Sequence, residues 1–219
     1  MSIFRLTGLA CLLALMATPL AAATVTVHVA DPQGRAVGDA VITLIPESAV
    51  ASQTPAQAPK TYYVDQKNEA FIPYVQILRP GDKVIFRNSD TTRHQVYSFS
   101  PIRQFEFVLR PGQSSPTLVL DKTGIVAVGC NIHDDMITYL FVSNAPAIGM
   151  SDRAGDATFD GLAPGRYTVR LWHPQLPPGA PQPEQQVSLG SAADAPHLKF
   201  TLTLVADPRG PMTHARADY

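Results

Sequence analysis

The chain of 219 residues has a formal net charge of −1, and 45% of its residues are hydrophobic while 16% are charged. This balance excludes a disordered chain and is enough for one sizeable core or two small ones. It leaves no basic surplus for a nucleic-acid backbone or an anionic membrane. Twenty prolines and 14 glycines exclude a helical bundle and favour short strands joined by turns.

Residues 1–23 are predicted to be a cleaved signal peptide. Arg5 forms a short positive region, residues 6–15 are apolar, and Ala21–Ala23 form a small-residue cleavage site. The mature chain is expected to start at Thr24 and to reside in the periplasm. The alternative, an uncleaved membrane anchor, is disfavoured because the apolar run is too short, and no later run is long enough to span a bilayer.

Cys130 is the only cysteine of the predicted mature chain, because Cys11 lies in the signal peptide. An internal disulfide is therefore excluded. An unpaired thiol in an oxidising compartment is expected to be buried, to pair with another chain or to bind a metal.

The first mature strands precede a linker. Residues 24–29 alternate apolar and polar side chains, which predicts a half-buried strand, and a second strand is predicted over 40–45. Residues 24–48 thus form a first strand pair. The Ala-, Gln- and Pro-rich stretch 49–60 is typical of a linker, so a new unit is expected from Thr61.

Short apolar runs separated by Pro-Gly turns follow this linker and favour a β-sandwich or barrel over residues 61–146. They predict eight strands, over 62–65, 75–79, 83–88, 95–99, 105–109, 117–120, 125–128 and 137–142. Strand patterning resumes within 147–205, where strands are predicted over 157–159, 167–172 and 198–204. Residues 206–219 are expected to be a flexible tail. No amphipathic helix is predicted, so the fold class is all-β.

Metal-binding chemistry is concentrated in one short block. Cys130, His133 and Met136 supply a thiolate, an imidazole and a thioether, and His94 supplies a second imidazole at the start of a predicted strand. A trigonal His₂Cys plane with a weak axial methionine suits both copper oxidation states, because thiolate and thioether are soft donors and imidazole is intermediate. Three donors on one tight loop and a fourth on a neighbouring strand would also hold the site rigidly.

Each of these residues has a simpler interpretation. A free cysteine such as Cys130 packs well in a core, His94 alone would be an ordinary strand histidine, and Met136 alone would be a core residue. Only the spacing of Cys130, His133 and Met136, with His94 upstream, favours a metal site. We interpret Trp172-His173 as packing at a strand end. The remaining histidines are interpreted as structural or exposed, and these are His28, His197 and His214.

At the metal-binding residues the sequence resembles the cupredoxins, the type 1 blue copper proteins that include plastocyanin, pseudoazurin and amicyanin. The Cys-x-x-His-x-x-Met spacing over 130–136 is similar to the short ligand loop of amicyanin. Residues 88–94, Asn-Ser-Asp-Thr-Thr-Arg-His, are similar to the segment with the family's first ligand. The resemblance covers roughly residues 61–143. It implies a Greek-key β-sandwich with one copper ion per chain, bound by His94, Cys130, His133 and an axial Met136.

The runs 94–100 and 130–134 also resemble exported proteins labelled methylamine utilization proteins, a label that does not itself show methylamine metabolism. Two residues depart from the blue copper pattern. Gln95 stands where an Asn usually ties the two ligand segments together. Asp135 stands beside Met136 where a large apolar residue is expected, and its carboxylate would lower the reduction potential or alter partner docking.

Residues 37–44 and 152–167 resemble the carboxypeptidase regulatory-like, transthyretin-like β-sandwich. We infer that residues 24–48 and 147–205 close into one small sandwich, with the cupredoxin domain inserted between them.

Three functions compete. The first is a periplasmic electron carrier or electron-transfer module, whose partner would be a redox protein such as a cytochrome or a dehydrogenase. The second is a copper-handling protein that binds or delivers the ion without redox turnover, and the third is a structural or adhesive β-module without metal. An enzyme is not expected, because no second copper site, paired carboxylates or Ser/His/Asp constellation is visible. A monomer is expected.

Overall fold

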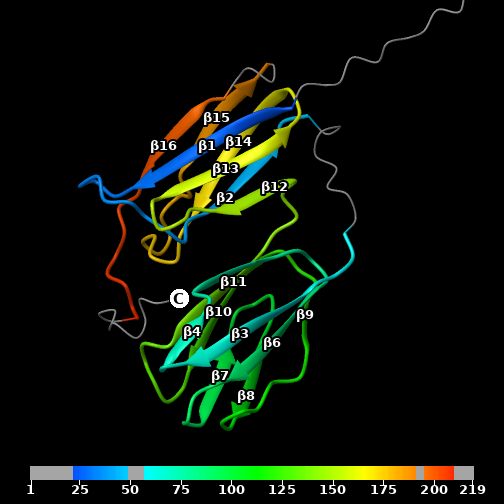
Figure 1. Ribbon diagram of the computed structural model, residues 1–219, viewed down its shortest axis with the longest axis vertical. Coiled ribbons are helices and arrows are strands. Elements are labelled where there is room, and N and C mark those ends of the chain that lie inside the picture. Colours follow the sequence, from blue (N-terminus) through cyan, green and yellow to red (C-terminus); the bar gives the residue numbers. More distant parts are fainter. Residues whose placement is uncertain (1–21, 49–56, 191–194, 210–219) are drawn as a thin grey trace, which may run out of the picture.

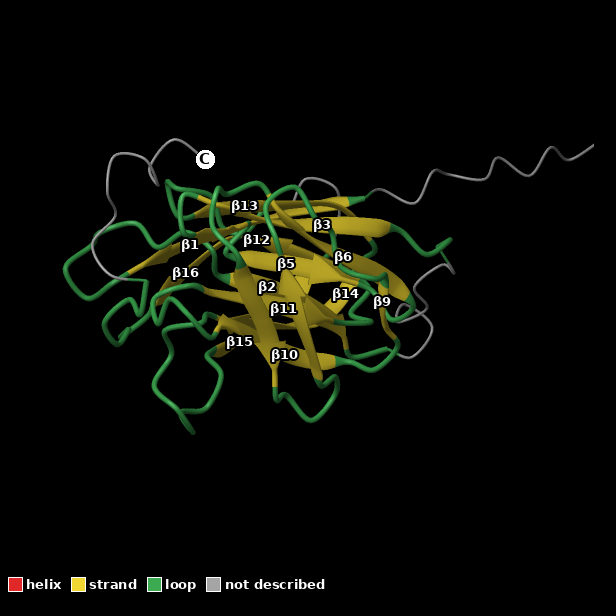
Figure 2. Cartoon of the chain, turned by 90° about the horizontal axis from the view of Figure 1, so that it is seen from below, coloured by secondary structure: helices red, strands yellow, loops and turns green. Residues whose placement is uncertain are grey.

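The computed structural model describes residues 22–48, 57–190 and 195–209. Within these ranges the chain forms strands β1 to β16 and no helix, which confirms the all-β fold class (Figures 1 and 2). The same ranges contain no helix of the length and apolarity that crossing a membrane requires. The predicted signal peptide, linker and tail lie largely outside the described residues, and His214 lies outside them as well.

Strands from the two ends of the chain form one β-sandwich, which we name the terminal sandwich (Figure 1, upper half). Its first sheet has the order β13-β1-β16, with β13 (Asp156–Leu162), β1 (Ala23–Ala30) and β16 (His197–Thr201). Its second sheet has the order β12-β2-β14-β15, with β12 (Ala147–Met150), β2 (Val41–Pro46), β14 (Gly165–Trp172) and β15 (Glu184–Leu189). Alternation in β1 buries Val25, Val27 and Val29 in an apolar core between the two sheets.

The strands between β2 and β12 form a second β-sandwich, which we name the central sandwich (Figure 1, lower half). One sheet has the order β4-β3-β6-β9, with β4 (Ala70–Ile72), β3 (Thr61–Lys67), β6 (Asp82–Asn88) and β9 (Leu118–Leu120). The other has the order β5-β11-β10-β7-β8, with β5 (Val75–Leu78), β11 (Ile137–Val142), β10 (Gly124–Cys130), β7 (His94–Ser98) and β8 (Phe105–Leu109). Phe86, Leu120 and Leu140 are fully buried between these sheets.

The two sandwiches pack against each other through a third apolar cluster. Strand β11 has apolar residues on both faces: Leu140 belongs to the central core, whereas Tyr139 and Phe141 face the terminal sandwich. There the indole ring of Trp172, at the end of β14, lies 5.6 Å from the Tyr139 ring and 5.3 Å from the Phe141 ring, measured between centroids. The interpretation of Trp172 as a packing residue agrees with these contacts.

Some strand boundaries differ from the sequence prediction. Residues 61–146 form nine strands, β3 to β11, rather than eight, because Ala70–Ile72 forms the additional short strand β4. Strands β12 and β15 were also not predicted, and β16 ends at Thr201 instead of reaching residue 204. Strand β15 is an edge strand that buries only Val187 and Leu189, so its sequence has too few apolar residues to show a period.

Candidate metal centre

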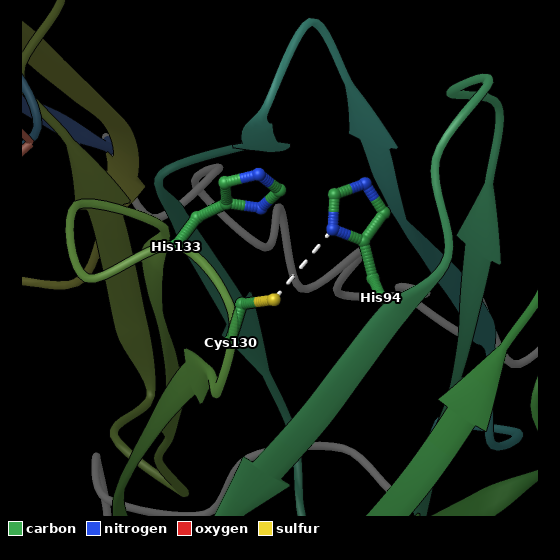
Figure 3. A group of neighbouring side chains, drawn as sticks. All are labelled: His94, Cys130 and His133. Carbon is green, nitrogen blue, oxygen red and sulfur yellow. Dashed lines mark hydrogen bonds between the residues drawn. The ribbon is translucent and has the colours of Figure 1, made fainter.

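Three of the four candidate ligands lie together at one end of the central sandwich (Figure 3). One ligand atom from each of His94, Cys130 and His133 lies within 4.8 Å of the others. The thiol Sγ of Cys130 is 3.6 Å from Nδ1 of His94. The two imidazole centroids are 5.2 Å apart and the rings are inclined by 54°. The arrangement leaves the thiol and both rings facing a common point.

The strand register explains this convergence. Strands β7 and β10 are antiparallel neighbours with Cys130 opposite Val96, so the first residue of β7 and the last residue of β10 lie at the same end of the sheet. The loop after Cys130 is closed by two backbone hydrogen bonds. Met136 N donates to the carbonyl of His133 (3.1 Å), and Cys130 N donates to the carbonyl of Met136 (3.2 Å). Met136, the fourth candidate ligand, is buried in the same apolar core as Cys130.

Burial within the centre is uneven. His94 is 0% exposed and Cys130 and Met136 are almost fully buried, whereas the His133 side chain is 22% exposed. The Nδ1 atom of His133 is nevertheless buried and has no hydrogen-bond partner among the described residues. Leaving such an atom unsatisfied costs about 1–3 kcal/mol. A metal ion bound between the thiol and the two rings would satisfy this nitrogen.

The chemistry of the donor set therefore fits copper. One thiolate, two imidazoles and a nearby thioether combine soft and intermediate donors, the set that suits copper in both oxidation states. The rings would hold an ion through their Nδ1 atoms, because their Nε2 atoms face carboxylates. Nε2 of His94 lies 2.8 Å from Oδ2 of Asp90, and Nε2 of His133 lies 3.7 Å from Oε1 of Glu69.

Neither Asp90 nor Glu69 was predicted from the sequence to contact the candidate ligands. Asp90 precedes His94 by four residues, and a carboxylate this close to a candidate ligand could have indicated a contact with its ring. Nothing in the sequence indicated the contact of Glu69 with His133, because only the fold brings the turn after β3 next to this ring.

Gln95 joins the two ligand segments in spite of departing from the blue copper pattern. The Asn131 side chain donates to Oε1 of Gln95 (3.1 Å), and the Asn131 backbone N–H donates to the Gln95 carbonyl (3.0 Å). Gln95 also donates to the carboxylate of Glu106. Gln95 thus provides the tie between ligand segments that is expected of Asn. Asp135, the second departure, lines a cleft between the two sandwiches.

The other described histidines are not part of the centre. The buried His173 donates from Nε2 to the carbonyl of Gly38 (3.1 Å) and accepts at Nδ1 from the backbone N–H of Gln175 (3.1 Å). Burial lowers the pKa of His173 to about 4, and the bond to Gly38 only partly opposes this shift. At the surface, His28 contacts Asp156 and His197 contacts Thr26. These contacts agree with a structural or exposed role for all three rings.

No protein-family model and no curated protein matches the chain. Several solved structures are similar to part of it. A copper-containing nitrite reductase from Thermus scotoductus SA-01 is 24% identical over 45% of this chain and 25% of its own, with a TM-score of 0.35. A reduced amicyanin variant is 16% identical over 42% of this chain and 99% of its own, with a TM-score of 0.36. A purple cupredoxin from Nitrosopumilus maritimus is 17% identical over 37% of this chain and 98% of its own, with a TM-score of 0.33.

Proposed function

We propose that the protein is a periplasmic cupredoxin-type copper protein that carries electrons. The observation that supports this most directly is the buried, unpartnered Nδ1 of His133 next to the thiol of Cys130 and Nδ1 of His94. The proposed ligands are these three residues and an axial Met136, with one copper ion per chain. Bound copper would supply a one-electron couple between Cu(II) and Cu(I).

The ligand side chains are held in place by the protein itself. His94 is fixed by Asp90, and the loop with Cys130 and His133 is closed by backbone hydrogen bonds and tied to Gln95. A rigid ligand set changes little when the charge of the centre changes, which favours fast electron transfer over catalysis or release of the ion. We therefore propose no enzymatic activity.

The partly exposed edge of His133 is the proposed route for the electron. The other three ligands are buried, and the neighbouring Ile132 is 40% exposed, so a partner that docks here reaches the centre through a short path. We propose that this partner is a redox protein, a cytochrome or a dehydrogenase. The terminal sandwich would hold the carrier near its partner, and the carrier itself would be a monomer.

A copper titration tests the proposal. The mature chain, purified without metal, is titrated with Cu(II) while the visible spectrum and the metal content are measured. One copper per chain with an intense thiolate charge-transfer band and a reversible redox couple is the expected result. Stoichiometric copper without the band would favour a copper-handling protein instead. Absence of copper binding would overturn the proposal and favour a structural β-module.

A further inference from the structure

The turn between β3 and β4 lies against the outer side of the candidate centre. It is a two-residue hairpin turn, since Lys67 pairs with Ala70 and the residues between them, Asn68 and Glu69, have φ of 53° and 56°. Two consecutive positive φ angles are typical of a type I′ turn, whose second position favours glycine. A glutamate at this position is unfavourable for the backbone, because its Cβ approaches the following carbonyl.

A single carboxylate stabilises this turn and contacts the buried histidine at the same time. Oδ1 of Asp90 accepts a hydrogen bond from Asn68 N (2.6 Å), and Oδ2 accepts one from Glu69 N (3.1 Å). The same Oδ2 atom lies 2.8 Å from Nε2 of His94, and the Asp90 side chain is only 12% exposed. Because an ionised carboxylate only accepts hydrogen bonds, the proton of His94 must be on Nε2. The lone pair on Nδ1 then faces Cys130.

The position of Asp90 is set by hydrogen bonds within its own loop. Asp90 N donates to the side-chain oxygen of Asn88 (2.9 Å). The amide of Asn88, which is 1% exposed, donates to the carbonyls of Thr92 (2.8 Å) and Leu109 (2.9 Å). The loop that ends at His94 is therefore held in place by hydrogen bonds of its own backbone and of Asn88.

Glu69 brings a second carboxylate to the other histidine. Its Oε1 is 3.7 Å from Nε2 of His133, an ion-pair distance too long for a hydrogen bond, and its side chain is 58% exposed. The turn thus places negative charge near the outer nitrogens of both rings. Negative charge at this distance stabilises the more positive ion, so it favours Cu(II) over Cu(I).

We propose that Asp90 and Glu69 are positioning residues that orient the two histidine ligands from the β3–β4 turn and lower the reduction potential of the bound copper. This inference rests on the proposed function, because it assigns an effect on a copper couple. It explains why a glutamate occupies a turn position that favours glycine. Asp90 is expected to have the larger effect on the reduction potential, because it is more buried than Glu69 and lies closer to its histidine.

Metal-free protein provides the first test, because it does not require the centre to be loaded. Nitrogen-15 NMR at pH 8 is expected to show His94 as a single Nε2–H tautomer. Asp90→Ala should convert His94 to a mixture of tautomers, whereas Asp90→Asn should keep the single tautomer, because the amide oxygen still accepts a hydrogen bond. Circular dichroism and urea unfolding confirm that each variant is folded. An unchanged tautomer in Asp90→Ala would overturn the positioning role.

The reduction potential of the copper-loaded protein provides the second test. We expect Asp90→Asn to weaken Cu(II) binding relative to Cu(I) about tenfold, which for a one-electron couple raises the midpoint potential by about 59 mV. Glu69→Gln should raise it by less, and Glu69→Gly, which suits the turn backbone, should agree with Glu69→Gln. Asp134→Asn is the matched control, since it removes an exposed negative charge from the ligand loop itself.

The outcomes separate the two proposals. An equal shift in Asp134→Asn and Asp90→Asn, or no shift in Asp90→Asn, would overturn the inference while the copper function stands. A wild-type protein that binds no copper would overturn the proposed function and the effect on potential together, and the tautomer of His94 would still decide whether Asp90 positions that ring.

Discussion

The central and terminal sandwiches each bury a histidine, and the partners of the two rings differ. His173 in the terminal sandwich is bonded at both nitrogens by backbone groups, those of Gly38 and Gln175. His94 in the central sandwich has side-chain partners, the carboxylate of Asp90 and the thiol of Cys130. Burial alone therefore does not distinguish a structural histidine from a candidate ligand. The distinction comes from the chemistry of the groups that contact the ring.

The largest expected difference between the sandwiches is in copper binding. Cys130→Ser should abolish the intense visible band, because the thiolate forms the short bond that produces it, whereas Met136→Gln should keep the band and shift the potential. His173→Gln, which changes a buried histidine of the other sandwich, should leave the spectrum unchanged. Copper titrations followed by visible absorption measure all three variants. A Cys130→Ser protein that keeps its colour would show that the ligand assignment is wrong.

The second expected difference is in the pH dependence of stability. The pKa of His173 is lowered from 6.5 to about 4 in the folded chain, so the unfolded chain binds the proton more tightly. The stability that depends on neutral His173 is fully present above pH 6.5 and is lost as the pH falls from 6.5 towards 4. The loss reaches about 3 kcal/mol at the acid end. Urea unfolding at pH 7 and pH 4.5 measures it.

His173→Gln is the matched variant for this measurement, since glutamine can still donate to Gly38 and does not titrate in this range. The difference in unfolding free energy between wild type and variant should shrink as the pH falls. A constant difference would show that His173 does not titrate on unfolding.

Local patterns in the sequence were sufficient for the parts of the structure that depend on neighbours along the chain. The strict alternation of residues 24–29 predicted strand β1, and the spacing of Cys130, His133 and Met136 identified a loop whose first two donors do converge. The approach of His94 to Cys130 depends on the pairing of β7 with β10. Residue spacing could not predict this pairing, and the expectation that the two residues meet came from the resemblance to a known family.

Contacts between distant segments were not predictable in this way. Glu69 reaches His133 only because the fold places the β3–β4 turn beside the loop that follows Cys130. Trp172 was assigned to packing, but its partners Tyr139 and Phe141 belong to the other sandwich. Strand β15 was missed for a different reason. It pairs with β14 along its whole length although its sequence is mostly polar. The pairing depends on backbone hydrogen bonds, which leave no pattern in the sequence.

A smaller effect is expected where the two sandwiches meet. Trp172→Ala removes the ring that contacts Tyr139 and Phe141, and because Trp172 is only half-buried the loss should be about 2 kcal/mol, below that of a core tryptophan. Urea unfolding at neutral pH measures the loss, and Trp172→Phe should recover part of it. An unchanged unfolding midpoint would show that the sandwiches are stable without this contact.

The smallest expected effect concerns the segment after β16. Residues 206–219 were predicted to form a flexible tail, but within the described part Arg209 contacts both Asp207 and the central sandwich. Its guanidinium lies 3.4 Å from the centre of the Tyr74 ring, and Nε donates to Asp207 Oδ1 (2.9 Å). The side chain is 26% exposed, so solvent screens the interaction only partly.

Arg209→Gln should therefore lower the unfolding free energy by about 1 kcal/mol, the range of a cation–π contact that is partly removed from water. The same variant should raise the pKa of Asp207, which hydrogen bonds from Arg209 now hold below its usual value. Arg209→Lys keeps the positive charge but not the planar guanidinium group, so it should recover only part of the stability. If Arg209→Gln changes neither the stability nor the pKa of Asp207, the segment contributes nothing to the fold and the predicted tail begins at residue 206.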